Sequence, residues 1–194
     1  MASLNLSLIF GSVRSDRRGI RAVRYLERAL SGRGHAVTTI DPVAYPLALL
    51  DRMYKEYPTG SAPAGLERLA TIYRASDAFV IVTGEYNHTM PPALMNLLDH
   101  FLEEYFWRPS AIVSYSSGQF GGVRAAVQLR APLCELGMPS IPSLLPIPRI
   151  EAVLDSDGTP IDPDGLTRRF NRFAAELEWY AEALQEQRRR GVPY

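Results

Sequence analysis

The sequence predicts one α/β domain in which a parallel β-sheet is covered by helices on both faces. Strand-like and helix-like segments alternate strictly along the chain, and one strand is apolar at every position, as a strand buried on both faces requires. The 194 residues, 46% of them hydrophobic, supply enough material for a single core. We therefore expect residues 1–194 to form a single domain.

Hydrophobic periodicity places the elements of the first half of the chain. Residues 4–10 are expected to form the first strand, and residues 20–30, apolar at helical spacing, the first helix. Residues 36–40 form the second strand and residues 64–75 the second helix. The intervening residues 43–62 are rich in proline and aromatics, so we expect an irregular segment over the surface near the site or at a subunit contact.

The third strand and the helix after it organise the rest of the sequence. Residues 78–82 form a continuous β-branched and aromatic run, which is typical of a central parallel strand. Pro91 and Pro92 fit the first turn of a helix, and the apolar spacing predicts that this helix covers residues 92–105. The polar stretch G-E-Y-N-H lies between them, and a loop at the carboxyl end of a parallel strand is where open α/β sheets bind ligands.

The second half of the chain completes the alternation. Residues 110–115 are expected to form the fourth strand, residues 123–136 a helix, and residues 141–147 a strand whose prolines confine it to an edge of the sheet. A last helix covers about residues 164–189. Five strands with one helix per connection favour the flavodoxin-like, doubly wound order 2-1-3-4-5. This order brings the loops after the first, third and fourth strands to one mouth.

Composition excludes several classes of function. The formal net charge is zero, so an extended nucleic-acid surface is not expected. We expect a cytoplasmic protein without a membrane partner, because no run approaches the roughly 20 apolar residues of a membrane span and the start of the chain lacks a basic leader. Cys134, the single cysteine, lies in an apolar helical stretch and is expected to be a buried structural thiol. The three histidines show no metal-ligand spacing.

The loop after the first strand has the chemistry of an anion site. It contains a turn glycine, two serine hydroxyls and three arginines before a helix N-terminus. Exposed amides, the helix dipole and guanidinium groups all favour a monophosphate, although a solvated basic loop is the alternative. The loop has neither the Walker A lysine nor the G-x-G-x-x-G of dinucleotide-binding folds. The strand ends also lack the acids of a phosphorelay receiver domain.

Three motifs together resemble a known family. These are G-S-V-R after the first strand, E-Y-N-H followed by N-L-L-D after the third, and S-Y-S-S-G-Q-F-G-G-V-R after the fourth. In the same order and spacing, residues 4–136 resemble the NADPH-dependent FMN reductase family, which includes quinone, chromate and azo-dye reductases. The resemblance implies a flavodoxin-like fold with FMN and NADPH as cofactors.

The resemblance also implies roles for individual residues. The FMN phosphate would be held by Ser12, Arg14 and the amides near Gly19 and Ile20. The isoalloxazine edge would be lined by the backbone of Gly84, Glu85, Tyr86 and Asn87, and the other side of the ring closed by Tyr115, Ser116 and Gly118. Two positions depart from the family. Arg17 replaces a small hydroxyl residue and either adds a second phosphate partner or points to solvent, and Gly84 replaces a proline.

The sequence therefore predicts an oxidoreductase that takes hydride from NAD(P)H onto FMN and passes electrons to a quinone, azo, metal-oxyanion or free-flavin acceptor by a ping-pong mechanism. The chemistry belongs to the cofactor, and no side chain is assigned as a catalytic acid or base. The alternatives are a flavodoxin-type electron carrier and a flavin-binding regulatory protein. Such carriers are usually strongly acidic, which this chain is not. The wide apolar spread after Pro92 predicts a homodimer or a dimer of dimers.

Overall fold

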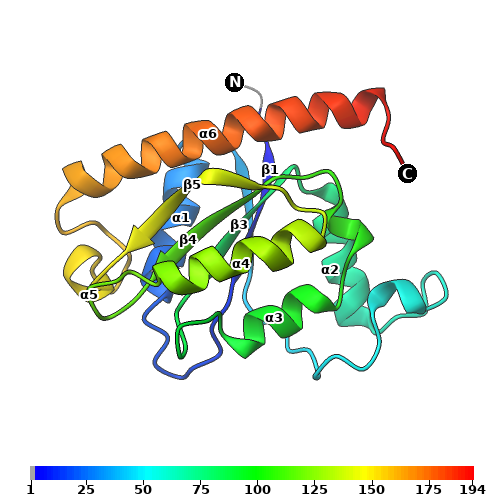
Figure 1. The fold of residues 1–194 in the computed structure, drawn as a ribbon, viewed down its shortest axis with the longest axis horizontal. Coiled ribbons are helices and arrows are strands. Elements are labelled where there is room, and N and C mark those ends of the chain that lie inside the picture. Colours follow the sequence, from blue (N-terminus) through cyan, green and yellow to red (C-terminus); the bar gives the residue numbers. More distant parts are fainter. Residues whose placement is uncertain (1–2) are drawn as a thin grey trace.

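The computed structural model describes residues 3–194 and contains one five-stranded, all-parallel sheet in the order β2-β1-β3-β4-β5 (Figure 1). This confirms the predicted doubly wound topology. The strands are β1 (Asn5–Phe10), β2 (Ala36–Ile40), β3 (Ala78–Thr83), β4 (Ser110–Tyr115) and β5 (Ser140–Ile147). The helices are α1 (Ile20–Ser31), α2 (Ala64–Ala75), α3 (Pro92–Asp99), α4 (Val123–Glu135), α5 (Ile150–Val153) and α6 (Pro163–Arg190), with 3₁₀ turns η1 (Tyr54–Glu56) and η2 (Glu103–Tyr105).

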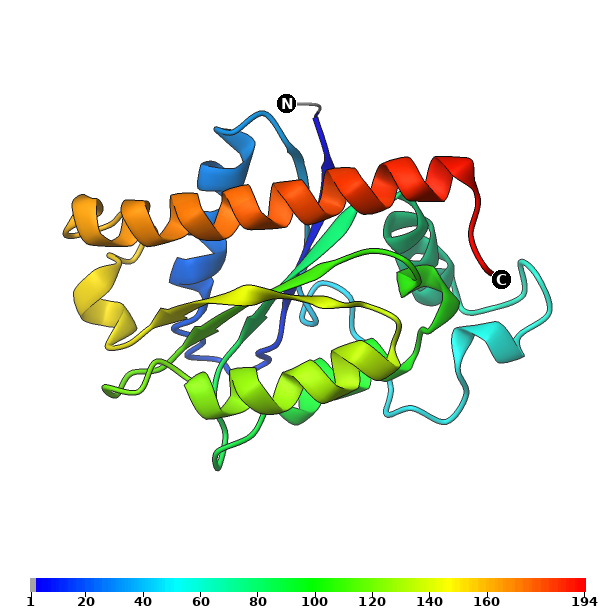
Figure 2. The same cartoon turned by 45° about the horizontal axis from the view of Figure 1, so that its top comes forward.

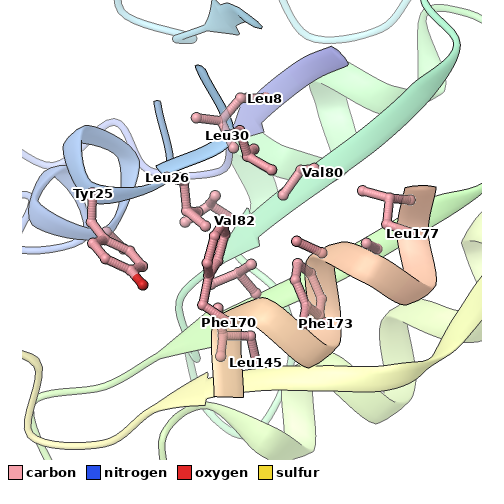
Figure 3. Packing of buried hydrophobic residues seen from close by; sticks show 14 of the residues in the cluster. Leu8, Tyr25, Leu26, Leu30, Val80, Val82, Leu145, Phe170, Phe173 and Leu177 are labelled. Carbon is pink, nitrogen blue, oxygen red and sulfur yellow. The ribbon is translucent and has the colours of Figure 1, made fainter. Parts of the chain in front are cut away.

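Helices cover both faces of the sheet and enclose two cores. In Figure 2, α6 crosses one face of the sheet while α3 and α4 lie on the other. Successive strand residues point to opposite faces, so Val80 packs with α1 and α6 whereas Phe79 and Ile81 pack with α2, α3 and α4. Figure 3 shows Phe173 and Leu177 of α6 directed at the core that contains Val80. β3 is buried along its whole length, as its continuous apolar sequence predicts.

The helix after Pro92 is shorter than the sequence predicts. α3 ends at Asp99, so the expected range 92–105 is wrong. The Nδ1 atom of His100 lies 2.6 Å from the carbonyl oxygen of Asn96, and the carbonyl of His100 accepts the amide of Tyr54 at 2.8 Å. These two contacts replace the hydrogen bonds that would continue the helix.

Much of the apolar spread of this region is buried within the chain. Phe101 and Tyr105 are fully buried. Phe101 packs edge-on against Tyr73, and Tyr105 packs edge-on against Phe79. These two side chains are therefore not available to a partner subunit. Aromatic pairs in this geometry contribute about 0.5–1.5 kcal/mol beyond the area that they bury.

Cys134 is exposed, so the expectation of a buried thiol is wrong. α4 buries Ala125, Ala126, Leu129 and Leu133, and Cys134 follows on the outer side of the helix. Among residues 3–194, no helix combines the length and the apolar run needed to cross a bilayer.

The core on the α6 side can be tested with two substitutions on one helix. Phe173→Ala, at a side chain that is 1% exposed, is expected to lower the free energy of unfolding by about 3–5 kcal/mol because it leaves a cavity. Trp179→Ala, at a side chain that is 67% exposed, should change it by less than about 0.5 kcal/mol. Urea denaturation of both variants measures the difference, and equal losses would contradict the assignment of the buried face.

Candidate functional site

A cleft of about 400 Å³ opens where the loops after β1, β3 and β4 meet. Nine residues that the sequence assigns to a cofactor line it: Ser12, Arg14, Arg17, Gly84, Glu85, Tyr86, Tyr115, Ser116 and Gly118. The other three lie beside the lining: Gly19 packs behind the ring of Tyr115, Ile20 begins α1, and Asn87 lies in a turn. The strand order explains this convergence, because parallel neighbours end at the same edge of the sheet.

Three further residues line the cleft without having been assigned from the sequence. They are Asp16, Arg18 and Ser117. Each is a direct neighbour in sequence of an assigned residue or of the arginine-rich loop. That adjacency was the available signal.

The loop after β1 presents backbone amides that have no partner in the described chain. Gly11 donates to the carbonyl of Val82 at 3.0 Å, and Ile20 donates to the carbonyl of Arg17 at 3.0 Å. Between them, the amides of residues 12–19 donate to no acceptor within residues 3–194. Most of these residues are exposed and their amides can bond to water, but Ser12 and Gly19 are buried, and an anion at the N-terminus of α1 would supply an acceptor.

The three arginines of this loop have different partners. Arg17 pairs with Asp41 at 2.5 Å and lies 5.6 Å from the centre of the Phe10 ring, an arrangement that the sequence did not suggest. Arg18 donates to Ser117 and to Glu151, each at 3.0 Å. For Arg14, no hydrogen bond or ion pair occurs with the described residues, so its guanidinium is available to an anion.

Tyr115 fills the space between the loops after β1 and β3. A Cβ atom on Gly19 would lie 2.2 Å from Cζ of Tyr115, and one on Gly84 would lie 3.1 Å from its hydroxyl oxygen. A side chain at position 19 would therefore displace the tyrosine, and one at position 84 would press on its hydroxyl. Burial raises the pKa of Tyr115 to about 12, although the adjacent hydroxyl of Ser12 acts in the opposite direction. The phenol is consequently neutral, and able to donate a hydrogen bond, at neutral pH.

The loop after β3 is a tight two-residue hairpin. Tyr86 and Thr89 exchange backbone hydrogen bonds of 2.9 and 3.0 Å. Asn87 and His88 between them have φ angles of 50° and 67°, which is the geometry of a type I′ turn. The turn leaves the amides of Asn87 and His88 without an acceptor in the part of the chain described. The hydroxyl of Tyr86 is also buried without a partner, and an orphaned polar atom beside a cleft fits the binding of a polar ligand.

The side chain of Glu85 points away from this hairpin toward α4. Its Oε1 accepts from Nη1 of Arg124 at 2.6 Å, and its Oε2 accepts the backbone amide of Arg124 at 3.2 Å. α4 begins immediately after Gly121 and Gly122, whose φ angles are 63° and 73°. The loop after β4 thus enters α4 through two residues in the left-handed conformation.

Comparison with known proteins identifies the family. Residues 4–151 match the sequence profile described as NADPH-dependent FMN reductase. This chain belongs to the NADPH-dependent FMN reductase family. Its members are oxidoreductases, and the cofactors of the family are FMN and NADPH.

Two relatives illustrate the membership. The chain is 32% identical over 140 residues to an NAD(P)H-dependent FMN reductase of Pseudomonas aeruginosa, covering 69% of this chain and 71% of the relative. It is 30% identical over 141 residues to a quinone reductase of Pseudomonas putida, covering 70% and 72%.

Solved structures share the fold at lower sequence identity. FerB, an NAD(P)H:acceptor oxidoreductase from Paracoccus denitrificans, superposes with a TM-score of 0.75 at 21% identity over 92% of this chain and 98% of FerB. A flavodoxin variant from Pseudomonas aeruginosa superposes with a TM-score of 0.54 at 18% identity over 94% and 99%. The flavodoxin-like architecture is therefore shared.

Gly122 provides a test of the backbone at this site. A Cβ atom there would lie 2.8 Å from the backbone oxygen of Tyr115, and the φ of 73° is strained for any side chain. Gly122→Ala is expected to lower the free energy of unfolding by about 1–3 kcal/mol. Gly65→Ala is the control, since a Cβ there meets nothing within 4 Å, and it should leave stability unchanged or slightly raised. Thermal denaturation compares them, and two equally stable variants would show that the turn tolerates a side chain.

Proposed function

We propose that this chain is an FMN-dependent NAD(P)H oxidoreductase that passes electrons to a quinone, azo, metal-oxyanion or free-flavin acceptor. One observation carries the proposal. In a chain of this family, the free guanidinium of Arg14, the unpaired amides of the loop after β1 and the loop after β3 meet at one cleft. Relatives named quinone reductase and NADPH azoreductase support the quinone and azo classes.

The residues of the cleft fit FMN. Ser12, Arg14 and the amides that precede Ile20 would hold its phosphate, because they supply donors and positive charge at the N-terminus of α1. The backbone from Gly84 to Asn87 would line the ring edge, and Tyr115, Ser116 and Gly118 the opposite side. Asp41 engages only Nη1 of Arg17, so the remaining donors of this guanidinium would be available as a second phosphate partner.

Bound FMN supplies the chemistry, accepting hydride from the nicotinamide and passing electrons to the acceptor. The role of the protein is to bind the cofactor and to orient it. Amides aimed at the ring edge would favour its electron-rich form, and the neutral hydroxyl of Tyr115 would be able to donate a hydrogen bond without adding charge. Because one mouth leads to the ring, donor and acceptor would use it in turn, which supports a ping-pong sequence.

An electron carrier is the second candidate, since flavodoxin shares the fold. Carriers of that kind use strong negative charge to steer toward protein partners, whereas this chain has equal numbers of acidic and basic residues. Reduced nicotinamide distinguishes the candidates, because an isolated carrier does not turn it over.

We also propose a homodimer or a dimer of dimers, located in the cytoplasm, where reduced nicotinamide is produced. Apolar side chains stand in solvent in the loop after β1 and in the irregular segment 43–62, notably Val13 at 53% and Leu49 at 84% exposure. Asn96 of α3 holds the segment that carries Leu49, accepting the amide of Leu50 and donating to the carbonyl of Ala48. A fixed apolar surface of this kind is typical of a subunit contact.

Stopped-flow spectroscopy tests the proposed function. The purified protein is expected to bind about one FMN per chain, and NADPH should bleach the flavin absorbance before any acceptor is added. Steady-state oxidation with a quinone should then give parallel double-reciprocal lines. Binding of FAD alone, or no flavin after incubation with excess FMN, would refute the proposal.

Arg14→Ala is expected to weaken FMN binding more than Arg18→Ala does. The lost charge-assisted phosphate contact is worth about 1.5–3 kcal/mol, which is tenfold or more in Kd. Arg18 is the matched control because its guanidinium already pairs with Glu151 and Ser117. Fluorescence titration of apoprotein with FMN measures both values. An unchanged Kd for Arg14→Ala would remove this residue from the phosphate site.

Leu49→Asp is expected to shift the assembly toward single chains, because it places a charge in the proposed subunit contact. Ile161→Asp is the control, since Ile161 is 60% exposed and lies outside the segment held by Asn96. Light scattering at micromolar concentration gives the masses. A wild-type mass of one chain would contradict the proposed dimer.

A further inference from the structure

The start of α4 holds the hairpin after β3 at two points. Nη1 of Arg124 and its backbone amide donate to the two carboxylate oxygens of Glu85, at 2.6 and 3.2 Å. One turn further along α4, Nε2 of Gln128 donates to the carbonyl of His88 at 2.9 Å. The two contacts lie on either side of Tyr86 and Asn87, whose backbone is the proposed ring edge of the flavin site.

The Glu85–Arg124 pair is largely shielded from solvent. Its side chains are only 11% and 35% exposed, and the guanidinium also lies 4.3 Å from the centre of the Phe120 ring. Burial by itself would raise the pKa of Glu85, but hydrogen bonds from the Arg124 side chain and from the amides of Ala125 and Arg124 hold it below its ordinary value. Glu85 is therefore ionised at neutral pH. The N-terminus of α4 adds favourable dipole charge.

The hairpin needs such support. Asn87 and His88 both have positive φ angles without being glycine, and strained backbone persists only where its surroundings hold it. Their amides, which the hairpin leaves unpaired, take their direction from this turn. Displacement of the turn would redirect those amides.

We propose that the Glu85–Arg124 pair is a positioning device that sets the reduction potential of the flavin, by fixing the hairpin amides and by keeping a negative and a positive charge balanced beside the ring. The inference rests on the proposed function, since it requires FMN in the cleft. Glu85 and Arg124 are positioning residues and not catalytic ones. Neither side chain exchanges a proton with substrate in this proposal.

The opposite charges of Glu85 and Arg124 predict that removing one or the other shifts the reduction potential in opposite directions. Hydride transfer delivers two electrons and one proton to the ring, so the reduced ring carries more negative charge than the oxidised one. Glu85→Gln leaves the positive charge of Arg124 uncompensated and favours the reduced ring, which raises the potential. Arg124→Gln leaves the carboxylate of Glu85 uncompensated and lowers it. A pair that only held the loop in place would give shifts of the same sign in both variants.

The first experiment measures reduction potentials of the FMN-loaded variants by equilibration with reference dyes. Relative to wild type, Glu85→Gln should move to a higher potential and Arg124→Gln to a lower one, with the double variant between them. Glu186→Gln, which removes one partner of the exposed Glu186–Arg190 pair of α6, is the matched control and should not shift. Shifts of the same sign, or no shift, would overturn the proposal.

The second experiment needs no cofactor. Hydrogen exchange of residues 84–90 in the apoprotein should be faster in both single variants than in wild type or in Glu186→Gln. Unchanged exchange would show that the pair does not hold the hairpin and would overturn the positioning role. A wild-type protein that binds no FMN would instead refute the proposed function, while the exchange experiment would still report on the pair.

Discussion

The cleft depends on the burial of β3 between β1 and β4. All six residues of β3 are buried, and its amides and carbonyls are used by parallel neighbours on both sides. Apolar burial contributes about 25 cal/mol for each Å² removed from water, so a slip of this strand would expose side chains on both faces. Because the strand cannot slip, the hairpin that follows it must emerge between the loops of its two neighbours. The site is a consequence of that placement.

Local signals in the sequence were sufficient for the architecture. Apolar periodicity indicated the five strands, one helix per connection indicated their order, and glycines and polar residues in three loops indicated where a ligand could bind. The prolines of β5 correctly indicated an edge strand. These features depend on neighbours in sequence, which is why a single sequence reveals them.

Features that depend on distant partners were not accessible in this way. The end of α3 at Asp99 depends on a contact between His100 and Tyr54, which are 46 positions apart. The pairing of Arg17 with Asp41, and of Glu85 with Arg124, joins residues from different loops and helices. Cys134 was misplaced because the apolar composition of α4 does not specify which side chain turns outward.

The contact between Arg17 and Asp41 joins the loop after β1 to the end of β2. Asp41 follows β2, and besides Arg17 it accepts the backbone amide of Val43, the first residue of the irregular segment that leads to Leu49. Asp41 engages only Nη1 of Arg17, so a phosphate bound in the loop after β1 would share this guanidinium with Asp41. If phosphate binding altered this pair and the segment beyond Asp41 with it, a partner seated on that segment would alter phosphate affinity by the same amount. This ion pair is the physical route by which the loop after β1 and the exposed segment around Leu49 would be coupled.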